Sequence, residues 1–180
     1  SRDSDAAAEN AALLTLLAPM SRGKSLQGLV PGDIERPKRF LLKLHRRRDF
    51  AQHFLVSAGL AARGDSELSN AVGLFKEIMD IDLGTGFSFS DLAADKAGSR
   101  FGELAVSDRA AELQQALAAG VDDADLLPII DDLPEYMDDA EFEERFGRVG
   151  SPRYEAMMQD IRQRIMALPL YAEPESSVPG

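Results

Sequence analysis

No segment of this 180-residue chain alternates apolar and polar residues over the length of a β-strand, and this absence constrains the fold most strongly. Val and Ile are sparse, whereas Ala and Leu recur at the spacing of amphipathic helices. Ser, Asp, Gly and Pro residues divide the pattern into separate helices. We therefore predict an all-α fold, a single compact helical domain of about six to eight helices with no significant sheet.

Caps and breaks give the expected boundaries. Pro37 suits the first turn of a long helix that Gly64 would end. Ser88 or Ser90, Ser107 and Ser151 are the expected N-caps of later helices. The domain should cover residues 1–172, with an irregular crossover at 19–37 and a disordered tail at 173–180. The expected helices cover about residues 4–18, 37–62, 66–80, 88–101, 107–119, 122–131, 138–146 and 152–168.

A hydrophobic core has to hold these helices together without covalent links. The chain contains no cysteine, which excludes disulfides, thiolate nucleophiles and cysteine-based zinc sites. A chain of this size buries about two-thirds of its unfolded surface, so it needs no such links. The predicted core residues are Leu41, Leu44, Phe54, Leu60, Leu74, Phe75, Ile78, Leu92, Phe101, Leu113, Leu117, Ile161, Ile165 and Leu168.

The charge is acidic overall but unevenly distributed. A net charge of −11 argues against a nucleic-acid-binding protein. Residues 36–48 are nevertheless basic, and they could contact an anionic membrane surface or another polyanion. Alternatively, they form a solvated helix face that pairs with the acidic segment 122–144. That acidic segment lacks the spacing of an EF-hand and is interpreted as solvated surface. The basic residues are Arg36, Lys38, Arg39, Lys43, Arg46, Arg47 and Arg48, with His45 among them.

Three consecutive expected helices each carry polar residues spaced three or four apart, which places them on one face of each helix. Their flanks are small and apolar. Ionisable groups in such segments are costly unless they are paired, hydrogen-bonded or bound to a metal. We therefore consider a convergence of the three faces. The residues are Asp49 with His53, Lys76 and Glu77 with Asp80, and Asp91 with Asp95.

Converging faces allow three interpretations. One imidazole among carboxylates suits a divalent metal ion such as Mg²⁺, Mn²⁺ or Zn²⁺. Glu77 and Asp91 could instead be catalytic acid–base groups. In a lysozyme-like glycosidase, Glu77 would be the acid and Asp91 the second carboxylate. In the third interpretation a buried polar network holds the helices in register, and Asp49 or another carboxylate orients His53. The candidate metal ligands are His53, Glu77, Asp91 and Asp95, and the supporting residues are Asp49, Lys76 and Asp80.

The order of these motifs resembles a known family. Asp49-x-x-x-His53-Phe-x-x-Ser-Ala is followed by Gly73-x-x-Lys76-Glu77-x-x-Asp80 and then by Gly86-Phe-Ser-x-x-Asp91-Leu-x-x-Asp95-x-x-Gly98. Residues 49–98 thereby resemble the YfiM-like family of predicted bacterial periplasmic lipoproteins and, more distantly, VanZ-like membrane proteins. The resemblance implies a cell-envelope setting and a shared polar cluster.

Two functions follow from these expectations. The first is a helical interaction or structural protein in the periplasm or envelope of a Gram-negative bacterium, with its signal segment missing from this sequence. Its partner would be a protein or envelope component, and residues 36–48 offer contact with a membrane surface. No apolar run approaches the ~18 residues that span a bilayer. The second is a metal-dependent or acid–base hydrolase or transferase that acts on a phospholipid or cell-wall fragment.

Overall fold

The computed structural model describes residues 2–23, 41–64 and 86–172. Within these ranges the chain forms seven α-helices and one short 3₁₀ helix, and it contains no strand. Two isolated antiparallel bridges join Leu44 to Arg47 and Phe87 to Met137. The predicted all-α class is therefore confirmed. The elements are α1 (Arg2–Ser21), α2 (Arg48–Ala61), α4 (Phe89–Ala105), α5 (Ala110–Ala119), α6 (Asp123–Leu126), α7 (Asp139–Phe146), α8 (Pro152–Met166) and η2 (Pro169–Tyr171).

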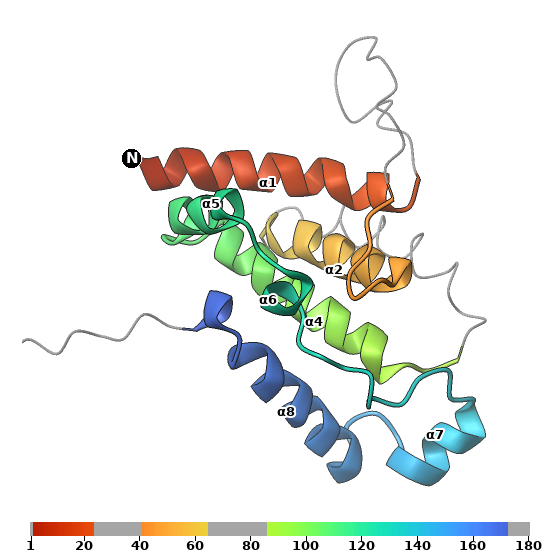
Figure 1. The fold of residues 1–180 in the computed structure, drawn as a ribbon. Coiled ribbons are helices and arrows are strands. Elements are labelled where there is room, and N and C mark those ends of the chain that lie inside the picture. The colour runs from red at the N-terminus through yellow and green to blue at the C-terminus, as the bar shows by residue number, and fades with distance from the viewer. Residues whose placement is uncertain (1, 24–40, 65–85, 173–180) are drawn as a thin grey trace, which may run out of the picture.

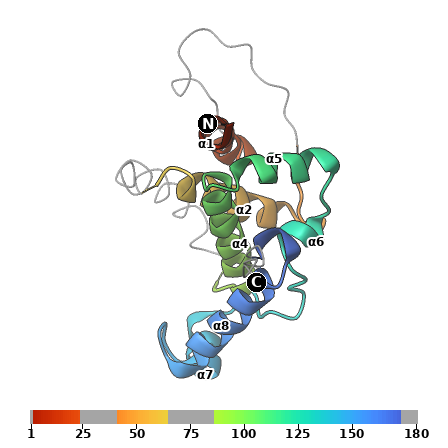
Figure 2. The same cartoon turned by 90° about the vertical axis from the view of Figure 1, so that its left-hand side faces the viewer.

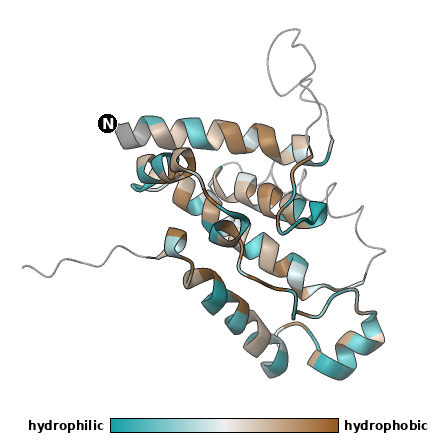
Figure 3. Cartoon of the chain, in the orientation of Figure 1, coloured by the Kyte–Doolittle hydropathy of each residue, from teal (hydrophilic) through white to brown (hydrophobic). Residues whose placement is uncertain are grey.

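Helix α4 is central to the fold. It packs most extensively against α2 and also contacts α1, α5 and α8 (Figure 1). Helix α1 lies across α2 and α5, whereas α7 and α8 form the end of the molecule remote from α1 (Figure 2). One continuous cluster of buried side chains connects helices α1, α2, α4, α5, α7 and α8. Hydrophilic residues cover most of α7 and much of α8 (Figure 3).

Serine caps fix where two of the helices begin, as predicted. The Ser88 hydroxyl accepts a hydrogen bond from the backbone N–H of Asp91 at 3.1 Å, and α4 starts at the next residue. The Ser151 hydroxyl accepts one from the backbone N–H of Tyr154 at 3.2 Å, with Pro152 in the first turn of α8. These caps set the starting points of α4 and α8. The cap predicted at Ser107 is wrong, because α5 begins at Ala110 and its N-cap residue is Arg109.

The helix expected over residues 37–62 begins only at Arg48, so its predicted start is wrong. Leu44 and Arg47 exchange two backbone hydrogen bonds of 2.9 Å, which close a tight turn. His45 and Arg46 have left-handed backbone angles, with φ of 49° and 63°. Each such residue costs about 1–2 kcal/mol, so surrounding contacts must maintain the turn. Residues 41–47 therefore form a turn in place of the helix that their sequence pattern predicts.

Two further helix ends near prolines differ from the prediction. Helix α1 continues to Ser21 with Pro19 inside it, instead of stopping at Ala18. The helix expected over 122–131 is a single turn that ends at Leu126. Leu127 is extended, with φ −138° and ψ 126°, because a residue before proline, here Pro128, avoids the helical region. The segment after α6 therefore crosses the core as extended chain.

Most of the predicted core residues that the structure describes are buried or half-buried. Leu41 and Leu117 are exceptions, with 69% and 39% of their surface exposed, so their assignment to the core is wrong. Leu41 precedes the tight turn, whereas Leu117 lies in the last turn of α5. The helix expected over 66–80, most of the 19–37 crossover, the 173–180 tail and the core candidates Leu74, Phe75 and Ile78 lie outside the described residues.

Candidate functional site

Helices α2 and α4 bring two of the predicted polar pairs together. The Nδ1 atom of His53 lies 3.2 and 3.3 Å from the two carboxylate oxygens of Asp95. The buried Ser57 hydroxyl donates a 2.7 Å hydrogen bond to the same carboxylate. The side chain of His53 is only 11% exposed. Asp95 therefore connects α4 to two successive turns of α2.

Asp91 lies on the other side of the imidazole. Its Oδ1 atom is 3.9 Å from His53 Nε2, and its side chain is 22% exposed. This oxygen is buried and accepts no hydrogen bond from the residues that the structure describes. Burial raises the pKa of Asp91, and the negative charges of Asp49 and Glu135 act in the same direction. The charge of His53 and the Ser88 hydroxyl oppose this rise without cancelling it.

Arg47 forms the outer part of the cluster. Its Nη1 atom donates to both oxygens of Glu135 at 2.6 and 2.7 Å. The same guanidinium bonds both oxygens of Asp49 and the Tyr136 hydroxyl, and it lies 4.0 Å from the centre of the Phe50 ring. Burial alone would raise the pKa of Asp49, but the hydrogen bonds and charge of Arg47 together hold that pKa below its usual value. The first turn of α2 is thus tied to the loop before α7.

The close approach of α4 to α2 explains why their polar side chains meet. Gly98 faces the backbone of Phe54, and a Cβ atom there would lie 2.8 Å from the Phe54 Cα and still closer to its carbonyl oxygen. Gly102, one turn later, faces Ala58 in the same way. Small residues spaced four apart allow two helix backbones to pack this closely. The His53–Asp95 contact depends on that short separation.

The structure brings His53, Asp91 and Asp95 together, and Asp49 joins their cluster through Arg47 and Glu135. His53 is oriented by Asp95, and not by Asp49 of its own helix. The three residues predicted on the intervening helix, Lys76, Glu77 and Asp80, lie outside the described residues.

Sequence reasoning missed Arg47, Glu135 and Ser90 as members of the cluster. Ser90 donates a hydrogen bond to Glu135 from the first turn of α4. Arg47 and Glu135 were each counted among surface charges, although a pairing of the basic stretch with the acidic segment was one of the open interpretations. Their ion pair confirms that pairing at one position. The sequence indicated only one role for Ser90, as an alternative N-cap to Ser88.

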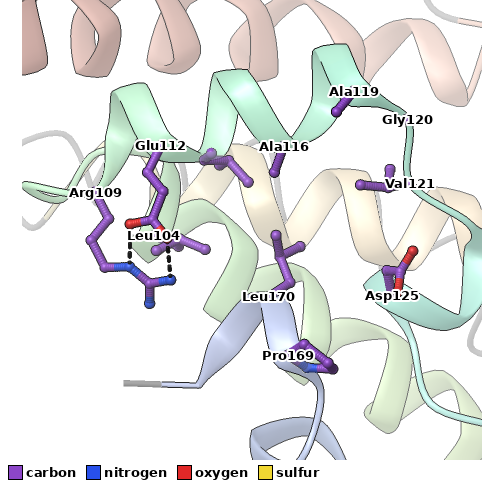
Figure 4. A pocket seen from close by; sticks show the side chains of 11 residues that line it. Leu104, Arg109, Glu112, Ala116, Ala119, Gly120, Val121, Asp125, Pro169 and Leu170 are labelled. Carbon is purple, nitrogen blue, oxygen red and sulfur yellow. Dashed lines mark hydrogen bonds and ion pairs between the residues drawn. The ribbon is translucent and has the colours of Figure 1, made fainter. Parts of the chain in front are cut away.

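The described residues offer no metal-binding group at this cluster, and two pockets of the fold lie away from it. Among the described residues, no set of three or more His, Asp or Glu side chains is arranged to hold a metal ion. A pocket of 350 Å³ lies between α5 and η2, where Arg109 pairs with Glu112 (Figure 4). A second pocket of 380 Å³ lies between α1 and α5. Neither is lined by a residue of the cluster.

Comparisons with family models, curated proteins and solved structures find no match for this chain. The resemblance of residues 49–98 to the YfiM-like family therefore stays a prediction from the sequence. None of the described helices combines the length and the apolar character that crossing a membrane requires.

Asp91→Asn should raise the free energy of unfolding at neutral pH. The raised pKa means that the folded chain keeps a proton that the unfolded chain releases near the usual value of 3.8. Stability from this group is therefore present below that value and is lost as the pH rises through the raised pKa. Asparagine carries no charge, so the variant does not lose this stability. Its free energy of unfolding should therefore exceed that of the parent by an amount that grows as the pH rises from the usual aspartate pKa through the raised pKa of Asp91. Urea unfolding at a series of pH values measures it.

Asp49→Asn is the matched control, with the opposite sign. Because Arg47 lowers the pKa of Asp49, this carboxylate stabilises the fold above the usual aspartate value, and its contribution is lost as the pH falls through the lowered pKa. The variant should therefore be less stable than the parent at neutral pH and equal to it in acid. Parallel pH profiles for the two variants would contradict the assignment.

Proposed function

We propose that this chain is a helical interaction protein of the cell envelope, in which the polar cluster is structural. One observation carries the structural role. Asp95 accepts hydrogen bonds from two turns of α2, where Gly98 and Gly102 let α4 approach the α2 backbone closely. Both polar partners of Asp95 are largely buried, as expected of groups that fix a helix register. The resemblance to periplasmic lipoproteins supports the envelope setting, and fractionation of cells that make the natural protein tests it.

A second candidate function is favoured by Asp91. A carboxyl group with a raised pKa beside an imidazole, itself held by a second carboxylate, is an arrangement used for proton transfer. The chain would then be an acid–base hydrolase or transferase acting on a phospholipid or cell-wall fragment. This proposal requires substrate access to Asp91. In assays on such substrates, Asp91→Asn should abolish turnover while the protein remains folded.

A thermal melt separates the structural role from a metal-dependent one. Chelator-treated protein is melted alone and with Mg²⁺, Mn²⁺, Ca²⁺ or Zn²⁺, and the series is repeated with His53→Ala. A metal at about a hundred times its dissociation constant would stabilise the fold by about 2.7 kcal/mol. On the structural proposal no metal shifts the melt, and His53→Ala costs about 1–3 kcal/mol because Asp95 loses a buried partner.

His45→Ala is the matched control, because the chain has only two histidines. A metal shift in the parent that persists in His45→Ala and vanishes in His53→Ala would overturn the structural proposal and make the cluster a metal site. A His53→Ala protein as stable as the parent would also contradict it.

A further inference from the structure

The segment 41–48, here named the cationic turn, lies at the surface and is anchored by its buried residue Leu44. Its central residues His45 and Arg46 both have positive φ, and the flanking Leu44 and Arg47 exchange backbone hydrogen bonds. This is the geometry of a tight hairpin turn, which usually requires Gly or Asn at the central positions. Here two bulky residues occupy them. Such strain persists only where the surroundings hold the backbone in place.

Contacts on both sides hold the cationic turn. The backbone N–H of His45 donates to Asp123 at 2.8 Å, and its ring Nε2 donates to the carbonyl oxygen of Leu127 at 2.7 Å. Leu44 is buried in the core. Arg47 is tied to Glu135 as described above. The tip of the turn is therefore positioned before any partner binds, which lowers the entropy cost of binding.

The side chains left on the outside are cationic and apolar. Lys43, Arg46 and Arg48 are exposed and form no ion pair or side-chain hydrogen bond within the described parts of the chain. Leu41 and Leu42 are exposed just before them. Arg148, Arg153 and Arg162 are also exposed and without an ion pair among the described residues, so exposed cations alone do not distinguish the cationic turn. Its distinction is that three such cations lie beside two exposed leucines, in a chain whose net charge is −11.

We propose that the cationic turn docks on an anionic lipid surface, with Lys43, Arg46 and Arg48 at the headgroups and the two leucines entering the interface. Cations flanked by exposed apolar side chains are the combination that membrane interfaces select. A long polyanion such as a nucleic acid would gain nothing from the two exposed leucines, whereas a lipid interface buries them. This inference rests on the proposed interaction function and names its partner.

The acidic remainder does not prevent docking, because the attraction is local. Charges further away than about 8 Å are largely screened at physiological salt. The carboxylates in contact with the turn already have partners within it, since Asp49 and Glu135 bind Arg47 and Asp123 accepts from the His45 N–H. The remaining cationic charge at the tip of the turn can therefore face a lipid surface. Higher salt should weaken the interaction.

Co-sedimentation of the full chain with vesicles tests the proposal. Vesicles of equal parts phosphatidylglycerol and phosphatidylcholine should bind the protein, and pure phosphatidylcholine vesicles should not. Each basic residue near such a surface is worth roughly a fivefold change in affinity, so replacing Lys43, Arg46 and Arg48 by Gln should weaken binding on the order of 100-fold. Replacing Leu41 and Leu42 by Ser should weaken it by about tenfold.

The matched control replaces three exposed arginines of the other end, Arg148, Arg153 and Arg162, by Gln, which removes the same charge and should leave vesicle binding unchanged. Equal melting temperatures show that each variant is folded. Absence of vesicle binding by the parent, or equal losses in both triple variants, overturns the proposal. Equally tight binding to polyphosphate that ignores the leucine change would instead assign the turn to a soluble polyanion. The melt with metals tests the structural role independently of either result.

Discussion

Gly98→Ala is expected to lower the free energy of unfolding by about 3 kcal/mol, although alanine is the better helix former. A Cβ atom at this position would lie 2.8 Å from the Cα of Phe54 and closer still to its carbonyl oxygen. These are backbone atoms, so no side-chain rotation relieves the clash. Helices α2 and α4 would have to separate. Urea unfolding of parent and variant measures the difference.

Separation of the helices should also disturb the polar cluster. The His53–Asp95 contact spans the same crossing, at 3.2 Å, and lies one turn before Gly98 on α4. The imidazole resonances of His53 should therefore shift in Gly98→Ala. Gly102→Ala should behave similarly, because its Cβ would lie 2.9 Å from the Cβ of Ala61 and closer to the backbone of Ala58.

Gly59→Ala is the matched control on the face of α2 that meets α1. Its Cβ would lie 3.1 Å from the Cβ of Ala18 and from the carbonyl oxygen of Leu14. Helix α1 can shift by a few tenths of an ångström to accept this, and alanine gains up to about 1 kcal/mol in helix propensity. The variant should lie within about 1 kcal/mol of the parent. A loss equal to that of Gly98→Ala would contradict the argument from close packing.

The features that local sequence determines could be predicted. Ser88 and Ser151 start their helices because a hydroxyl satisfies a backbone N–H two or three residues ahead, and the sequence contains everything that this requires. Asp91 and Asp95 are four residues apart, which is enough to predict that they share one face of α4. Their approach to His53 was predictable in outline, because costly polar groups in small apolar helices need partners.

The features that depend on distant contacts could not be predicted. The cationic turn breaks a helical pattern because Asp123 and Leu127, about eighty positions later, bind His45. The pair of Arg47 with Glu135 is separated by 88 positions. Nothing in either local sequence distinguishes these two charges from their neighbours on the surface. The choice of Asp95 over Asp49 as the partner of His53 likewise depends on the helix crossing.

Phe89→Ala should cost about 3–5 kcal/mol, the range expected when a fully buried aromatic ring is removed. Phe89 is the first residue of α4 and is 0% exposed. Its ring centre lies 4.6 Å from that of Phe146 in α7 and 5.8 Å from that of Tyr154 in α8. The ring thus attaches both C-terminal helices to α4. Urea unfolding gives the loss, and an unchanged dependence on urea would show that the fold still unfolds as one unit.

Phe142→Ala is the control, because its ring belongs to the same aromatic group but is only partly buried. It should cost less than half as much as Phe89→Ala, since less apolar surface leaves water on folding. Phe89 lies between Ser88, which caps α4, and Ser90, which bonds Glu135. If its ring anchors this end of α4, Phe89→Ala should also shift the His53 resonances, whereas Phe142→Ala should not. If the two variants changed the free energy of unfolding and the His53 resonances equally, the aromatic rings would contribute alike and Phe89 would have no special role.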